Sequence, residues 1–85
     1  MAEVVLITGA SSGFGRACAT HLQARGYRVF GTSRRAAEEP AVDPEGGFMM
    51  VRMDVDDDAS VERGVAQVLQ QAGRIDALIN NAGTG

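Results

Sequence analysis

The sequence contains no lysine, because all eight basic residues among its 85 are arginine. Its single cysteine, Cys18, excludes an internal disulfide and suits a reducing compartment. A basic N-terminal stretch and a long apolar run are both missing, so we expect no secretory signal, no membrane span and a cytoplasmic protein. The formal net charge of −3 gives no electrostatic reason to expect nucleic acid or an anionic membrane as a partner.

In the first part of the chain, the spacing of apolar residues predicts a strand, then a helix, then a second strand. Residues 4–8 form an uninterrupted aliphatic and β-branched run, which is typical of a strand buried on both faces of a parallel sheet. After a glycine- and serine-rich stretch, a helical spacing continues to Arg25 and ends at Gly26, the expected C-terminal cap. Residues 27–32 predict a second strand. The expected apolar face of the helix consists of Phe14, Ala17, Cys18 and Leu22.

The second part of the chain predicts the same order of strand, helix and strand after a polar segment. Residues 33–47 show no periodicity and contain both prolines, so we predict a loop with a short helical turn near residues 35–39. Residues 48–53 predict a third strand, and residues 76–80 a fourth. Between them lies a helix that ends at Gly73, with candidate N-caps among the acids at positions 56–58. Its expected apolar face consists of Val61, Val65, Val68, Leu69 and Ala72.

The element order β-α-β-β-α-β predicts an α/β fold with a Rossmann-type parallel sheet and right-handed crossovers. No repeat and no second domain are evident in the sequence. We therefore expect residues 1–85 to form a single partial domain, the N-terminal half of a doubly wound fold, with the catalytic half absent.

A glycine-rich loop lies between the first predicted strand and the first predicted helix. Gly9, Gly13 and Gly15 would let the backbone turn tightly and approach a phosphate without an intervening Cβ. The helix N-terminus would offer unpaired N–H groups and a positive dipole end, and Ser11 and Ser12 add hydroxyl donors. The alternative is a strand-to-helix turn that requires positive φ only. The position between strand and helix favours diphosphate binding.

Two motifs together resemble those of the short-chain dehydrogenase/reductase family. The glycine spacing is Thr8-Gly9-x-x-x-Gly13-x-Gly15, and the sequence Asn-Asn-Ala-Gly at residues 80–83 is similar to the family's second motif. The resemblance covers the whole chain but only about the first third of a typical member, and it implies a nicotinamide-dependent oxidoreductase. Phe14 stands where the family usually has Ile and is expected to contribute its backbone N–H and some packing. A sugar epimerase or dehydratase of the extended branch is disfavoured, because that branch spaces its glycines as G-x-x-G-x-x-G.

The end of the second predicted strand indicates which cofactor the chain prefers. NAD-binding sites place a carboxylate there for the ribose hydroxyls, whereas this chain has Ser33, Arg34 and Arg35, with no acid until Glu38. A serine hydroxyl and a planar guanidinium suit a 2′-phosphate, so we predict NADP(H) in preference to NAD(H). The alternative is that the arginines are only the solvated start of a loop. Some NADP-preferring members also have a basic residue at the position of Ser12, so Arg34 must account for most of the preference.

The resemblance assigns further cofactor contacts after the third and fourth strands. Asp54 would accept a hydrogen bond from the adenine amino group, and Val55 would pack near the ring; alternatively, Asp54 only begins the acidic cap of the next helix. The backbone of Asn81, Ala82 and Gly83 would line the ribose, or the side-chain amides of this motif would instead tie adjacent strands together.

The residues that perform hydride transfer in this family are missing from residues 1–85. The family pairs a catalytic Tyr with a Lys four residues later, but the only tyrosine, Tyr27, is followed at that spacing by Gly31, and no lysine exists. We predict no catalytic residue, no metal site and no activity for the chain alone. The full-length protein would be a homo-oligomer that acts on a small carbonyl or alcohol substrate. The alternative function is a non-catalytic nucleotide-binding module, native at this length.

Overall fold

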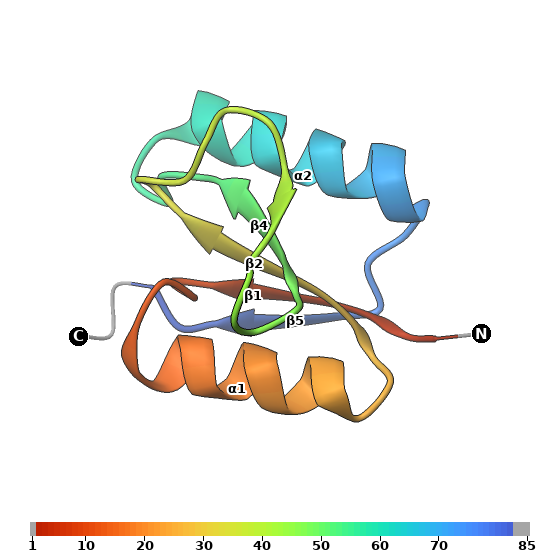
Figure 1. Cartoon of the computed structure of the whole chain (residues 1–85). Coiled ribbons are helices and arrows are strands. Elements are labelled where there is room, and N and C mark those ends of the chain that lie inside the picture. Colours follow the sequence, from red (N-terminus) through yellow and green to blue (C-terminus); the bar gives the residue numbers. More distant parts are fainter. Residues whose placement is uncertain (1, 83–85) are drawn as a thin grey trace.

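The computed structural model describes residues 2–82 as three layers, with a sheet between two helices that cover opposite faces (Figure 1). The aliphatic run at the N-terminus forms an inner strand of the sheet, with a neighbouring strand on each side, as its burial on both faces requires. The elements are β1 Val4–Thr8, α1 Gly13–Ala24, β2 Arg28–Ser33, β3 Ala41–Val42, β4 Met49–Arg52, α2 Asp58–Ala72 and β5 Ala77–Asn80. Neither helix in the described part is long and apolar enough to cross a membrane.

The strands lie in the order β3-β4-β2-β1-β5. β1 pairs in parallel with β2, where Val5 lies opposite Val29, and with β5, where Val5 lies opposite Ala77. β4 continues the parallel sheet beyond β2. The four parallel strands therefore follow the order of one half of a Rossmann sheet, which confirms the predicted fold class.

Two apolar clusters fill the spaces between the sheet and its helices. Alternate residues of β1 point to opposite faces, so that Ile7 belongs to the cluster beneath α1 and Leu6 to the cluster beneath α2. Phe48 is fully buried in the first cluster, and Phe30 is buried in the second. Residues from distant parts of the chain meet in both clusters, which fixes the sheet between the helices.

The predicted contact face of α1 is wrong at its first two positions. Phe14 is 72% exposed and Ala17 is also exposed, whereas Gly15 and Ala19 are buried. Small residues let the helix approach the sheet closely, and the side chain one residue before Gly15 is rotated about 100° away from that contact. The later positions of the prediction, Cys18 and Leu22, do pack against the core.

The contact face of α2 is also shifted from the predicted stripe. Ser60, Gly64 and Val68 are buried at a spacing of four residues, and Leu69 is 42% exposed, contrary to the prediction. A hydrophobic pattern does not reveal Ser60 and Gly64, although their small size permits the closest helix–sheet approach. The predicted acidic cap is confirmed at Asp57, whose side chain accepts hydrogen bonds from the N–H groups of Ala59 and Ser60.

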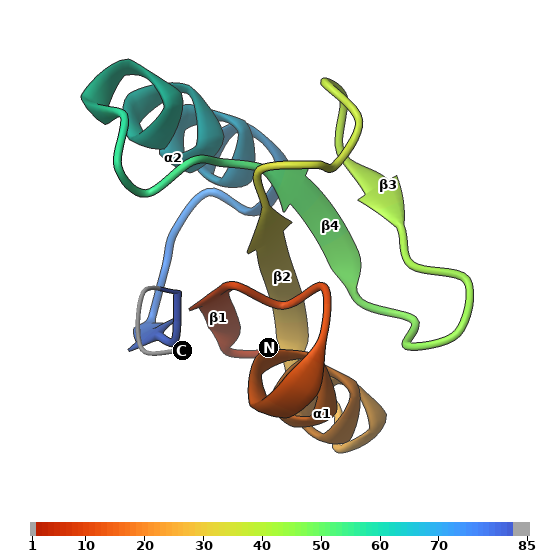
Figure 2. The same cartoon turned by 90° about the vertical axis from the view of Figure 1, so that its left-hand side faces the viewer.

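The segment between β2 and β4 is more ordered than the predicted loop. No helical turn forms near residues 35–39; instead a hydrogen-bonded turn spans Ser33–Ala36, with the Ala36 N–H 3.3 Å from the Ser33 carbonyl oxygen. β3 then pairs antiparallel with the edge of β4 (Figure 2). The segment is anchored by Asp43, whose carboxylate binds Arg16 of α1 through two hydrogen bonds of 3.0 and 2.7 Å. Such long-range contacts leave no local sequence pattern.

Candidate functional site

The loops that follow the parallel strands gather at one edge of the sheet. A hollow of about 460 Å³ lies there, lined by segments that follow β1, β2, β4 and β5. Ligands of open parallel sheets bind at this carboxyl edge. The lining residues are Gly9, Ser11, Ser12, Thr32, Ser33, Arg34, Arg35, Met53, Asp54, Val55, Asp56 and Ala82. We call this hollow the main groove.

The glycine loop supplies the backbone that faces the main groove. Gly9 and Gly13 have φ angles of +67° and +60°, a conformation that residues with a Cβ rarely adopt. The helix α1 then begins without a side-chain cap, because Ser12 makes no capping hydrogen bond and the first turn holds no acid. Its first N–H groups and positive dipole end are therefore available to an anion, which fits a diphosphate.

Gly15 fits the loop for a different reason, which is close packing. A Cβ at this position would lie 2.6 Å from the side-chain nitrogen of Asn81 and would collide with the Gly9 carbonyl oxygen. The glycine thus lets α1 start directly against the end of β1. Gly13, Phe14 and Gly15 form the first turn of α1, and the exposed Phe14 side chain belongs to neither core cluster of residues 2–82.

Thr8 joins the glycine loop to the segment after β5, a role that the sequence analysis missed. Its buried hydroxyl donates to the Asn80 side-chain oxygen at 2.9 Å and accepts from the N–H groups of Asn81 and Ala82 at 2.9 and 3.0 Å. One donor and two acceptor positions are what a hydroxyl offers. The position of Thr8 directly before the first glycine of the motif was the only available signal.

The two asparagines tie strands together, as one of the two sequence-based alternatives proposed. The Asn81 side-chain amide donates to the Gly9 carbonyl at 3.0 Å, and Asn80 is bonded to Thr8. Ala82 lines the main groove. Gly83, also predicted to line the ribose, lies outside the described residues.

The turn after β2 presents two arginines at the main groove. Arg34 and Arg35 occupy the central positions of the Ser33–Ala36 turn, and both side chains are exposed. The Ser33 hydroxyl accepts the Arg35 N–H at 3.2 Å, and its hydrogen can still be donated to a ligand. The nearby β2 residue Thr32 anchors the glycine loop, because its hydroxyl and carbonyl oxygens accept the N–H groups of Gly9 and Ala10.

Asp54 and Val55 line the main groove after β4. The Asp54 carboxylate accepts the Asp56 N–H at 3.0 Å, and its own N–H donates to the Ser60 hydroxyl at 2.8 Å. Asp57, not Asp54, caps α2. The carboxylate therefore does not serve as the helix cap, the alternative considered from the sequence, and it lies where a ligand in the groove could reach it.

A parallel sheet with an uncapped helix N-terminus and a glycine loop at its carboxyl edge defines a Rossmann-type α/β protein. The family model described as short chain dehydrogenase matches residues 3–85. The chain belongs to the short-chain dehydrogenase/reductase family, which confirms the resemblance drawn from its two motifs. Membership implies a nicotinamide cofactor.

Individual relatives agree with this assignment. The chain is 45% identical over 83 residues to a 3-ketodihydrosphingosine reductase of Bacteroides thetaiotaomicron, covering 98% of this chain and 29% of that protein. It is 37% identical over 87 residues to an NADPH-dependent pterin aldehyde reductase of Arabidopsis thaliana, covering 98% and 36%. A solved short-chain dehydrogenase from Streptomyces avermitilis superposes with a TM-score of 0.79 at 42% identity, covering 98% and 31%. The chain thus spans about a third of the length of these proteins.

Proposed function

We propose that this chain is the cofactor-binding part of an NADP(H)-dependent oxidoreductase that transfers hydride between the nicotinamide and a carbonyl or alcohol substrate. The observation that carries the NADP(H) preference is the turn after β2, where Ser33, Arg34 and Arg35 line the main groove and the four residues Ser33–Ala36 include no carboxylate. The Arabidopsis relative is named as an NADPH-dependent reductase, which supports the same preference.

Each segment of the main groove has a proposed part in binding. The N–H groups that begin α1, with the hydroxyls of Ser11 and Ser12, hold the diphosphate. Ser33 donates to the 2′-phosphate, and Arg34 and Arg35 neutralise its charge. The following contacts complete the proposed site: Asp54 accepts from the adenine amino group, Val55 packs beside the ring, and the backbone of Asn81, Ala82 and Gly83 lines the ribose.

When bound, NADP(H) supplies or accepts the hydride. Residues 1–85 contribute binding and orientation, because they contain no lysine and therefore no Tyr-x-x-x-Lys pair. We place the catalytic residues, the substrate pocket and the subunit contacts of a homo-oligomer in other parts of a longer polypeptide. Residues 1–85 alone are then inactive, which an assay of the purified segment with NADPH and a panel of carbonyl compounds tests. Turnover by that segment would contradict this part of the proposal.

Exposed apolar residues on β5 and on α2 favour a longer polypeptide over a module complete at this length. β5 is an edge strand, and its residue Leu78 is 61% exposed. Leu69 on α2 is 42% exposed. A protein native at this length would present this surface and an open strand edge to water. The encoded reading frame distinguishes the two: a Tyr-x-x-x-Lys sequence about 70 residues beyond Asn80 supports the enzyme, and a stop codon after Gly85 supports the module.

The cofactor preference is tested by Arg34→Asp in the full-length protein. Replacing a charge-assisted contact with a like charge should weaken NADPH binding by about 2 kcal/mol, roughly thirty-fold, and leave NADH binding little changed. Arg25→Asp makes the same charge change at the opposite end of α1 and should alter neither affinity more than about two-fold. An unchanged NADPH affinity in the Arg34 variant would overturn the assignment of NADP(H).

A further inference from the structure

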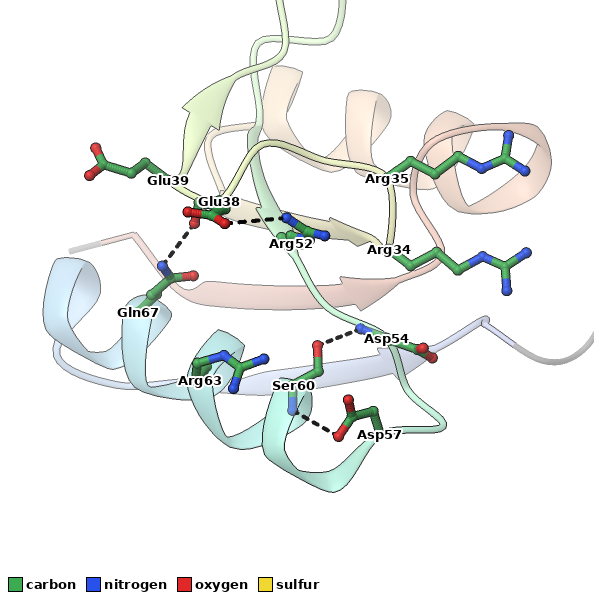
Figure 3. Close-up of a pocket in the computed structure, with 10 residues that line it drawn as sticks. All are labelled: Arg34, Arg35, Glu38, Glu39, Arg52, Asp54, Asp57, Ser60, Arg63 and Gln67. Carbon is green, nitrogen blue, oxygen red and sulfur yellow. Dashed lines mark hydrogen bonds and ion pairs between the residues drawn. The ribbon is translucent and has the colours of Figure 1, made fainter.

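A second hollow of about 910 Å³ adjoins the main groove, and Arg34, Arg35 and Asp54 line both. It is built from the turn after β2, the end of β4 and one face of α2 (Figure 3). Its charged lining is mixed, with four arginines and four carboxylates. The residues are Arg34, Arg35, Glu38, Glu39, Arg52, Asp54, Asp57, Ser60, Arg63 and Gln67. We call it the side hollow.

Of the two arginines of the side hollow that lie outside the turn after β2, Arg52 and Arg63, Arg52 lies on the strand that pairs with β2. In the parallel ladder between β2 and β4, Arg52 is the direct partner of Ser33. Neighbouring strands are separated by about 4.8 Å, a shorter distance than the length of an extended arginine side chain. Arg52 can therefore reach a phosphate held by Ser33 and Arg34 without movement of the backbone.

In this structure, the Arg52 side chain faces the carboxylate of Glu38. Its guanidinium lies 3.8 Å from the Glu38 carboxylate, whereas Arg34 and Arg35 extend away from this pair (Figure 3). The two side chains are 52% and 88% exposed, and an exposed pair at this distance contributes little stability. A phosphate group, with more charge and three acceptor oxygens, is a stronger partner for the same guanidinium.

Glu38 is held beside Arg52 by its backbone. The Glu38 carbonyl accepts a hydrogen bond of 3.1 Å from the Gln67 side chain on α2, which ties this part of the connection to the helix. Glu39, its neighbour, lines the same hollow but makes no ion pair within residues 2–82. Of the two acids, Glu38 is the one that pairs with Arg52.

We propose that Arg52 is a second specificity-determining residue for the 2′-phosphate and that it exchanges Glu38 for this phosphate when the cofactor binds. Glu38 thereby limits the preference for NADP(H), since it must give up its partner first. This inference rests on the proposed NADP(H) preference. The new element is that the Glu38 carboxylate and the 2′-phosphate of the cofactor compete for the guanidinium of Arg52.

The test uses the full-length protein and compares dissociation constants for NADPH and NADH, with adenosine 2′,5′-bisphosphate and AMP as probes of the adenosine end alone. Arg52→Met should weaken binding of the two 2′-phosphorylated ligands about five- to ten-fold and leave NADH and AMP within two-fold. Glu38→Gln should strengthen NADPH binding about three-fold. Arg63→Met and Glu39→Gln make the same charge changes in the same hollow and should have effects below two-fold.

The double variant Glu38→Gln/Arg52→Met tests the exchange itself. If Glu38 acts by occupying Arg52, its replacement should no longer strengthen NADPH binding once Arg52 is gone. A persistent gain would mean direct repulsion and would overturn the exchange, as would equal effects of Arg52→Met and Arg63→Met. If NADPH is preferred and Arg34→Asp abolishes that preference while Arg52→Met changes nothing, only this inference fails. If the unaltered protein shows no NADPH preference, the proposed function fails with it.

Discussion

The Asn81 side-chain amide donates a hydrogen bond to the Gly9 carbonyl oxygen at 3.0 Å, across 72 residues of chain. With the Thr8 hydroxyl, which accepts the N–H groups of Asn81 and Ala82, this contact makes one structural unit of the two family motifs. A change within the unit should therefore affect both motifs together.

Thr8→Val tests this unit at its centre. Valine keeps the shape of threonine but leaves two backbone N–H groups and one side-chain oxygen without their partner. We expect the free energy of unfolding to fall by about 2 kcal/mol, measured by chemical denaturation of the full-length protein. The matched control Thr20→Val, on α1, removes a hydroxyl that makes no hydrogen bond in the described part and should cost below about 1 kcal/mol. Equal costs would show that the Thr8 contacts contribute no stability.

Gly15→Ala tests the close approach of α1 to the glycine loop. The new methyl group would overlap the Gly9 carbonyl and the Asn81 amide, so we expect a loss of about 3 kcal/mol in stability and weaker cofactor binding. Gly64→Ala is the control, because this glycine is also buried and helical but its added methyl would meet chiefly the flexible end of Met53. Alanine has the higher helix propensity, so Gly15→Ala would raise the stability if propensity alone mattered. Such a gain would contradict the packing argument.

The Arg16–Asp43 pair should make stability depend on acid pH. The Arg16 guanidinium, with the Gly46 N–H, holds the pKa of the Asp43 carboxyl below its ordinary 3.8. A depressed pKa means that the contribution is complete above that ordinary pKa and is lost as pH falls through the lower folded value. Asp43→Asn should thus lower the Tm by about 3 °C at pH 7, with the difference from the unaltered protein shrinking below about pH 4.

Glu45→Gln provides the comparison for this pair. Glu45 faces the same guanidinium at 3.8 Å but is 90% exposed, so its loss should change the Tm by no more than about 1 °C. Thermal melts across pH 3 to 7 measure both variants. A difference between Asp43→Asn and the unaltered protein that is constant down to pH 3 would show that the carboxylate charge is not responsible.

Asp57→Ala should weaken the start of α2. The Asp57 carboxylate accepts the N–H groups of Ala59 and Ser60 at 3.0 and 3.4 Å, and loss of such a cap costs about 1 kcal/mol. Asp56→Ala, one position earlier, removes the same charge but no capping contact and should cost less than about 0.5 kcal/mol. Chemical denaturation curves compare the two, and indistinguishable midpoints would assign the effect to charge alone.

The order of the four parallel strands and the two helices could be predicted from the sequence because each of these elements has a local signature, whereas the short strand β3 was not predicted. The aliphatic run of residues 4–8 could be satisfied only by a strand buried on both faces, and the glycine spacing with the Asn-Asn-Ala-Gly sequence identified the family. The candidate site was also anticipated in outline, since Ser33, Arg34, Asp54 and Val55 all line the main groove. Their roles in binding stay predictions.

Only the tertiary structure decided which sides of the helices meet the sheet and what surrounds the groove. Gly15 and Gly64 mark the closest contacts, but a glycine has no side chain to register in a hydrophobic pattern, so Phe14 and Leu69 were wrongly predicted to face the core. Local sequence patterns indicate whether a segment is a helix or a strand and where it ends, because these properties depend on residues that are neighbours in the sequence. The pairing of Arg16 with Asp43 depends on contact between distant segments, and so does the position of Arg52 beside Ser33; the fold alone brings them together.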